Sequence, residues 1–256
     1  MTELKVIESD INISDAWGQA FLEVYENNEV SPLIISVTDF PDSLDITENS
    51  EIRNALDGIL KKQKKSLVKS VANTIFPRSL WNPSKDRSIL YDRHTKILPS
   101  IDSCRPNRHG HYFRRMIDFD GDGKINQIEK VIEVWNTHHR HSGMQIALFD
   151  PQREHKRSKE PILGFPCLHQ VSVDLYGSNG VNGLGLTAFY GTQYMLLKGY
   201  GNYLGLCRLG IFLAHEMGLK FTRFNCVSGK AKFNTSFRKT HKDSIKLVDV
   251  IKSNLK

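Results

Sequence analysis

Apolar residues recur along this chain with two different spacings, one typical of strands and one of helices. Alternating or continuous apolar runs predict strands at residues 4–7, 33–37, 144–149, 167–176, 183–190 and 221–227. Apolar residues three and four positions apart predict helices at residues 16–27, 48–60, 66–74, 126–135, 203–217 and 244–255. We therefore expect an α/β (α+β) fold, in which helices pack on a mixed sheet and residues 1–256 form a single domain.

Two of the predicted helices carry signals for where they begin or end. Asp15 precedes the apolar positions of the first helix and is predicted to cap it. The helix at 203–217 is apolar over much of its surface, which predicts that it is buried in the core. Gly218 follows it and is predicted to end it, because glycine readily adopts the left-handed conformation found after helices.

The segments between these elements differ in character. Residues 77–106 are rich in proline, serine and aspartate and show little periodicity, so we expect an ordered connection that carries a functional loop. Residues 150–164 are polar and charged and predict a second loop. The two strands at 167–176 and 183–190 flank Ser178-Asn179-Gly180, and this order predicts a β-hairpin.

Composition narrows the class of protein. The longest apolar runs fall short of the roughly 18 residues that a membrane-spanning helix needs, and the first residues, Met1 to Lys5, lack the apolar stretch of a secretory signal. The four cysteines, at 104, 167, 207 and 226, form no C-x-x-C pair, so we expect reduced thiols in a cytoplasmic protein. The net charge of +7 favours anionic partners such as nucleotides or folates and leaves nucleic acid open as a partner.

Five segments in a fixed order carry a resemblance to a known family. They are Gly110–Met116, Asn126–Ile128, Ile146–Pro151, Pro166-Cys167-Leu168 and Asn202. Their order and spacing resemble those of the thymidylate synthases, most closely the archaeal-type members and related pyrimidine C5 (hydroxy)methylases. The resemblance is clearest over residues 107–233, about half of the chain. It implies a thymidylate synthase-like fold and a homodimer whose sheets pack together.

The resemblance also implies a chemistry. In these enzymes a cysteine thiolate, here Cys167, adds to C6 of a uracil ring, and C5 then attacks a one-carbon unit on a reduced folate, methylene-tetrahydrofolate. A cysteine suits this step because its thiolate is strongly nucleophilic and leaves again readily. The thiolate needs nearby positive charge, for which Arg115, His169 and Arg140 are the candidates. The proposed substrate-binding residues are Asn202, which would orient the ring, Tyr112, Arg115, Arg140, His169, Thr192 and Arg78.

Several positions depart from the family pattern. The Arg-Ser pair that holds the nucleotide phosphate aligns with Gly191-Thr192, and the His and Tyr that hold the sugar align with Ala231 and Phe233. Each lost charge-assisted hydrogen bond removes roughly 1.5–3 kcal/mol. A C-terminal helix replaces the family's mobile tail, and no counterpart of its general-base Glu is evident. Two functions stay open: a pyrimidine-modifying enzyme that does not use ordinary dUMP, and a non-catalytic relative that binds a nucleotide or a protein.

A second motif predicts a different function. Residues 118–129 fit the calcium-binding EF-hand loop, with oxygen ligands expected from Asp118, Asp120, Asp122, the Lys124 carbonyl, Asn126 and Glu129. The competing interpretation is a tight Asp/Gly turn before a helix, which we favour because the preceding segment is short for an entering helix and no second loop follows. Adjacent histidines at 138, 139 and 141 point in different directions on any regular element, so they predict no metal site.

Overall fold

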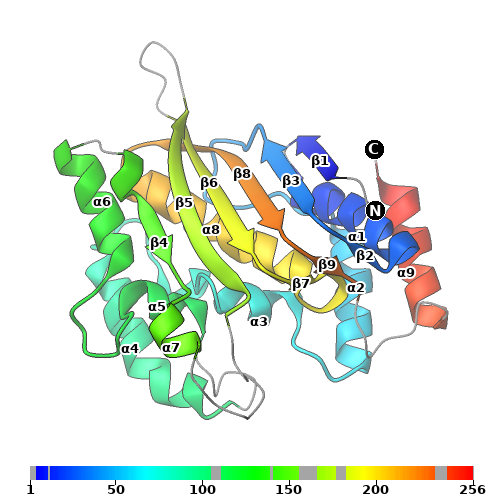
Figure 1. Cartoon of the computed structure of the whole chain (residues 1–256), viewed down its shortest axis with the longest axis horizontal. Helices are drawn as coiled ribbons and strands as arrows, with labels where there is room; N and C mark the ends of the chain where they lie inside the picture. The colour runs from blue at the N-terminus through cyan, green and yellow to red at the C-terminus, as the bar shows by residue number, and fades with distance from the viewer. Residues whose placement is uncertain are drawn as a thin grey trace.

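A six-stranded mixed sheet forms the centre of the protein (Figure 1). The computed structural model describes residues 4–10, 12–104, 111–138, 141–155, 166–176, 183–233 and 241–255. The strands follow the spatial order β1 (Lys5–Asp10), β3 (Leu33–Thr38), β8 (Lys220–Ser228), β6 (Gly183–Tyr190), β5 (Leu168–Tyr176) and β4 (Gln145–Ala147). The β1–β3 and β6–β8 pairs are parallel and the other pairs are antiparallel, so the predicted mixed α/β fold is confirmed.

Helices lie behind this sheet and at its two edges in Figure 1, and a second, smaller sheet lies at one end of it. The small sheet contains β2 (Glu29–Val30), β9 (Ala231–Lys232) and β7 (Gln193–Tyr194). The helices are α1 (Ile13–Asn27), α2 (Ser50–Lys62), α3 (Val68–Asn73), η1 (Arg78–Leu80), α4 (Ser88–Asp102), α5 (Tyr112–Ile117), α6 (Gln127–His138), η3 (His141–Gly143), α7 (Pro151–Glu154), η4 (Met195–Gly199), α8 (Tyr200–Glu216) and α9 (Lys242–Asn254). Among the described residues, no helix combines the length and the apolar character that crossing a membrane requires.

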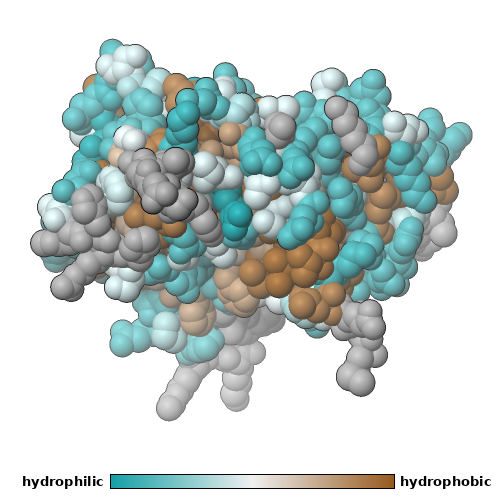
Figure 2. Space-filling model, turned by 90° about the horizontal axis from the view of Figure 1, so that it is seen from above, coloured by the Kyte–Doolittle hydropathy of each residue, from teal (hydrophilic) through white to brown (hydrophobic). Residues whose placement is uncertain are grey.

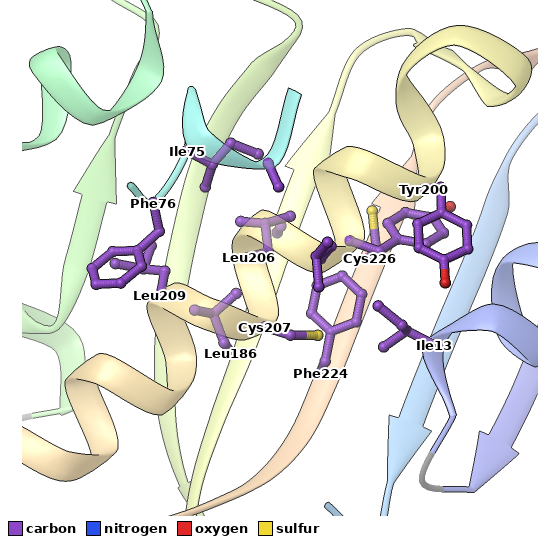
Figure 3. Close-up of a cluster of buried hydrophobic side chains, with 14 of the residues drawn as sticks. Ile13, Ile75, Phe76, Leu186, Tyr200, Leu206, Cys207, Leu209, Phe224 and Cys226 are labelled. Carbon is purple, nitrogen blue, oxygen red and sulfur yellow. The ribbon is translucent and has the colours of Figure 1, made fainter. Parts of the chain in front are cut away.

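The α8 helix lies against the back of the sheet, and its burial confirms the prediction made from its sequence (Figure 1). Figure 3 shows its Leu206, Cys207 and Leu209 among side chains from the sheet, such as Leu186 and Phe224. Glycines at 201 and 205 let α3 approach closely, since a Cβ atom at Gly205 would lie 2.7 Å from the carbonyl oxygen of Ala72. After Met217 the chain leaves the helix through Gly218, which has a φ of +67°, as predicted.

Two sequence-based expectations are wrong. No helix is predicted within residues 77–106, yet the described part of this segment contains the 15-residue helix α4. This helix was missed because only Leu90 and His94 on it are buried and Pro99 interrupts its pattern. Asp15 does not cap α1 either. The Asn12 side chain accepts a hydrogen bond from the Ser14 backbone at 2.8 Å, so the helix begins before Asp15.

The face of the sheet away from α8 carries a row of apolar side chains. Val6, Ile34, Val227 and Phe189 occupy neighbouring positions on β1, β3, β8 and β6. Val6 is 48% exposed and Phe189 is 42% exposed. Figure 2 shows a brown patch on the side of the molecule that faces the reader in Figure 1, where the sheet lies in front of α8. This open face therefore exposes apolar surface that the described helices do not cover.

Candidate functional site around Cys167

Cys167 lies at the point where β5 begins. The Gly191 backbone N–H, just after β6, donates to the Cys167 carbonyl at 3.0 Å and holds the residue against the end of the neighbouring strand. The thiol is half-buried, whereas Cys207 and Cys226 are fully buried in the core. Of these three cysteines, Cys167 is therefore the one whose sulfur an external molecule can reach.

Two tyrosines flank Cys167. The Tyr112 hydroxyl, at the start of α5, accepts a hydrogen bond from the Leu168 backbone at 3.4 Å. Burial and the nearby Cys167 thiol raise the pKa of Tyr112. Tyr190 ends β6, is fully buried, and its hydroxyl has no hydrogen-bond partner within the described part of the chain. Its pKa is raised well above the ordinary value by burial, with smaller effects from Tyr112 and Cys167, so both phenols are neutral proton donors beside the cysteine.

Lys198 supplies the positive charge at this site, and sequence reasoning did not assign it that role. Burial raises the pKa of the Cys167 thiol, and the Lys198 ammonium lowers it in part. Lys198 is exposed and makes no hydrogen bond or ion pair with another described residue. Surrounding protein atoms partly desolvate its ammonium and lower its pKa, an effect that Cys167 opposes. Lys198 thus offsets part of the effect of burial, which disfavours the thiolate.

The turn that carries Lys198 is held in place from α1. Residues Met195–Gly199 form a single wide helical turn, η4, immediately before α8. The indole Nε1 of the buried Trp17 donates to the Met195 carbonyl at 3.1 Å. Its ring also lies 5.3 Å from the ring of Tyr200, the first residue of α8. The sequence singled out 198–202 only as a glycine-rich turn, which gave no sign that Lys198 faces Cys167.

Two of the side chains proposed from the sequence to stabilise the Cys167 thiolate, those of Arg115 and His169, do not offer it an uncompensated positive charge. Arg115 donates to the Leu148 carbonyl at 2.8 Å and to the buried carboxylate of Glu154, which neutralises it. His169 packs between Phe149 and Phe189, with ring centroids 5.2 and 5.7 Å apart, and burial lowers its pKa, so it is neutral at physiological pH. The third candidate, Arg140, lies outside the described residues.

The remaining proposed substrate-binding residues fall into two groups. Asn202 lies on the first turn of α8, is only 5% exposed, and its side chain makes no hydrogen bond with another described residue. Thr192 is half-buried between β6 and β7. Arg78 stacks on Trp81 at 5.0 Å and lies 3.9 Å from Asp45, and Lys198, not Arg78, is the cation whose charge acts on Cys167.

The positions that differ from the thymidylate synthase pattern are closed to a phosphate or sugar. A Cβ atom at Gly191 would lie 2.8 Å from the His169 ring, so a larger side chain there would displace that ring. Ala231 is fully buried, and Phe233 is 3% exposed. Phe233 packs against Phe21 and Tyr25, with ring centroids 5.8 and 5.6 Å apart. These residues therefore belong to the hydrophobic core.

The acidic loop 118–129 forms a tight turn whose last acidic residue is engaged elsewhere. The Gly123 backbone donates to Asp118 at 2.8 Å, and Lys124 pairs with Asp122 at 2.8 Å. The Glu129 carboxylate accepts hydrogen bonds from Arg87 at 2.8 Å and from Tyr91 at 2.6 Å. The described residues contain no group of three or more His, Cys, Asp or Glu side chains arranged to hold a metal ion. The interpretation that this loop is only a turn, which the sequence favours over calcium binding, stays a prediction.

Comparison with protein-family models and with curated proteins identifies no relative of this chain. No protein-family model matches the chain, and no curated protein matches it. The chemistry of the residues around Cys167 must therefore support any functional assignment.

Proposed function

We propose that this protein is a transferase that adds a one-carbon group to C5 of a pyrimidine through a covalent adduct with Cys167. The observation that carries the proposal is the half-buried Cys167 thiol, which lies beside Lys198 and two neutral phenols. Lys198 would stabilise the thiolate, and Tyr112 would donate a hydrogen bond to the ring or to a water molecule. Asn202, buried without a partner, would orient the ring through its amide.

The proposed reaction needs no redox change at the cysteine. The Cys167 sulfur forms a bond to C6, and the electron pair of the C5–C6 double bond moves onto the C4 carbonyl as an enolate. C5 would then form a bond to the donor's one-carbon group, and the bond between that carbon and the donor would break with its electron pair going to the donor atom. Loss of the C5 proton to a base restores the double bond and expels the thiolate. A thiolate suits both the addition and the expulsion.

The substrate that we propose is not ordinary dUMP. The residues that hold the phosphate and the sugar in the family have no counterparts here. Ala231 and Phe233 are buried in the core, and the ring of His169 lies against Gly191. We propose that the substrate is a pyrimidine nucleotide or related molecule that is held by another anchoring group. Such an anchor is needed because the reacting atoms must be held about 3–3.5 Å apart.

A reduced folate, methylene-tetrahydrofolate, stays the proposed carbon donor on the strength of the resemblance. The C-terminal residues do not fit the closing role that the family's tail has over a folate. Asn254 donates to Glu51 at 3.0 Å and accepts from Asn49 at 3.2 Å. Leu255 lies beside Gly18. The end of the described chain is thus packed on α1 and α2, and we derive no step through the folate.

The alternative is a non-catalytic protein that binds a nucleotide or a protein partner. Two observations favour it: burial keeps the pKa of Cys167 above its ordinary value, and Glu154 neutralises Arg115. In that case Lys198 and Asn202 would contact a ligand without a covalent step.

Release of tritium from the C5 position of labelled pyrimidines separates these functions. We expect no useful release from dUMP with methylene-tetrahydrofolate, and release from another uracil or cytosine derivative. Cys167→Ala is the blank, and Lys198→Met should slow release, because the thiolate loses its cation. Robust Cys167-dependent release from dUMP would contradict the proposed substrate class. No release from any pyrimidine tested would favour the binding protein.

We also propose that the open face of the sheet forms a homodimer interface. Burying the row formed by Val6, Ile34, Val227 and Phe189 against a second copy would remove apolar surface from water. Light scattering after gel filtration should give twice the chain mass for the unmodified protein and the monomer mass for Phe189→Glu. Phe189→Leu serves as the control that keeps the surface apolar. A monomer for the unmodified protein would contradict this interface.

A further inference from the structure

A group of arginines lies on the helical side of the protein, away from the neighbours of Cys167. Between Tyr200 and Ala214, all of which the structure describes, Arg208 is the only residue of α8 that is not buried. Its charge interacts with those of Arg53 on α2 and Arg78 in η1. Three guanidinium groups from three different helices therefore lie near enough for their charges to interact.

Two of these guanidinium groups have fewer acceptors than donors. The Arg208 Nη1 and Arg78 Nε atoms are buried, and neither has a hydrogen-bond partner among the described residues. The nearest carboxylate oxygen to Arg78 belongs to Asp45 at 3.9 Å, beyond hydrogen-bonding distance, and the Asp45 side chain is 89% exposed. Buried N–H groups are almost always paired, so unpaired donors on two adjacent cations indicate a missing acceptor.

Two of the nearby carboxylates, those of Glu48 and Asp57, are already bonded to Arg53. Glu48 pairs with Arg53, and Asp57 accepts from Arg53 at 3.0 Å and from the Val68 backbone at 2.8 Å. Burial lowers the pKa of Arg208, and the charges of Glu48 and Asp45 oppose this effect, although neither carboxylate forms a hydrogen bond or ion pair with Arg208. An oxyanion with several acceptor atoms would satisfy both Arg78 and Arg208, because guanidinium groups bind phosphate and carboxylate oxygens in pairs.

A cavity of about 260 Å³ adjoins this group. Phe40, Leu44, Ile211 and Phe221 line it with apolar surface, and its polar lining includes His215 and the ion pair of Asp42 with Lys220. Arg78 and Arg208 lie beside this lining and are not part of it. Leu44 directly precedes Asp45, and Ile211 is one helical turn from Arg208. His215 packs against Trp81 with ring centroids 5.2 Å apart, and Arg78 stacks on the same indole. Apolar walls beside unsatisfied cations are the arrangement expected of a site for an amphipathic anion.

We propose that Arg78 and Arg208 bind the phosphate or carboxylate group of a small organic molecule whose apolar part enters this cavity. Arg78 is held by its stacking on Trp81, which orients its donors before the ligand arrives. The site does not depend on Cys167 chemistry, because its residues do not overlap with those around the thiol.

Calorimetric titration with three probes tests this site: phenyl phosphate, benzoate and inorganic phosphate. We expect phenyl phosphate to bind more tightly than inorganic phosphate, because its ring adds contact with Leu44 and Ile211. Benzoate shows whether a carboxylate suffices. Arg208→Met and Arg78→Met should each weaken phenyl phosphate binding at least about tenfold, since each removes charge-assisted hydrogen bonds. Two separate variants keep the test valid if one of them folds poorly.

Two control variants make the result specific. Arg223→Met removes one positive charge from the open face of the sheet and should leave the dissociation constant within about twofold. Cys167→Ser should do the same, which separates this site from the proposed catalytic one. No binding of any probe, or equal binding by the unmodified protein and both arginine variants, would overturn the proposal.

Discussion

Arg115 and Glu154 form a largely buried ion pair that joins α5 to α7 beside the strand that carries Cys167. The Glu154 side chain is 8% exposed, and Arg115 also donates to the Leu148 carbonyl. Removing one partner of a buried pair leaves an uncompensated charge. We therefore expect Glu154→Ala to lower the free energy of unfolding by about 3–5 kcal/mol, measured by urea denaturation. Glu133→Ala, which breaks the exposed pair with Lys130, should cost less than about 1 kcal/mol.

Alkylation should distinguish the cysteines. In the folded protein, iodoacetamide should label Cys167 faster than Cys207, which is fully buried on α8. Lys198→Met should slow Cys167 labelling at pH 8, because loss of the cation raises the pKa of the thiol further and reduces the thiolate fraction. Lys252→Met on α9 is the control. Equal labelling of Cys167 and Cys207, with unfolded protein as reference, would count against a nucleophilic site.

Acid should destabilise the protein through His94. This residue is 1% exposed, and neither ring nitrogen has a hydrogen-bond partner within the described chain. Burial lowers its pKa to about 4. In the unfolded chain the His94 side chain is therefore protonated as the pH falls through about 6.5, whereas in the folded protein it is protonated only near pH 4.

We accordingly expect the contribution of His94 to stability to fall as the pH drops below about 6.5. Between pH 7.5 and pH 5 the loss should be about 2 kcal/mol, measured by urea denaturation at both pH values. His94→Leu should reduce the difference between the two pH values, whereas the exposed His241→Asn should not. An unchanged difference in His94→Leu would show that another group is responsible.

Calcium should leave the melting temperature unchanged. The carboxylate expected at the last ligand position, Glu129, is already bonded to Arg87 and Tyr91. A ligand at 100 times its dissociation constant would stabilise the fold by about 2.7 kcal/mol, and a protein of this size would shift by roughly 2–4 °C per kcal/mol. Scanning fluorimetry with calcium and with magnesium as control measures this. A calcium-specific shift that Asp118→Ala abolishes would establish the site instead.

The sequence predicted those parts of the fold where one face of an element is strongly apolar. The α8 helix and the β5–β6 pair could be predicted for this reason. Gly218 could be predicted as the end of α8 because the backbone there adopts a left-handed conformation that favours glycine. The α4 helix buries too few side chains to give such a pattern. At the site, Cys167 was identified by its neighbours in sequence. Lys198 could not be identified in this way. Its position depends on how η4 turns before α8, and no local sequence pattern indicates that turn.

The hydrogen bond from Trp17 to the Met195 carbonyl gives the protein a built-in optical reporter. Indole emission responds to the polarity and hydrogen bonding around its N–H, and Trp17 holds the turn from which Lys198 extends. Of the other two tryptophans, Trp81 directly follows η1 and Trp135 lies on α6, and both contact other elements. With both replaced by phenylalanine, the emission of Trp17 would follow the turn beside Cys167 directly in solution, without an attached dye.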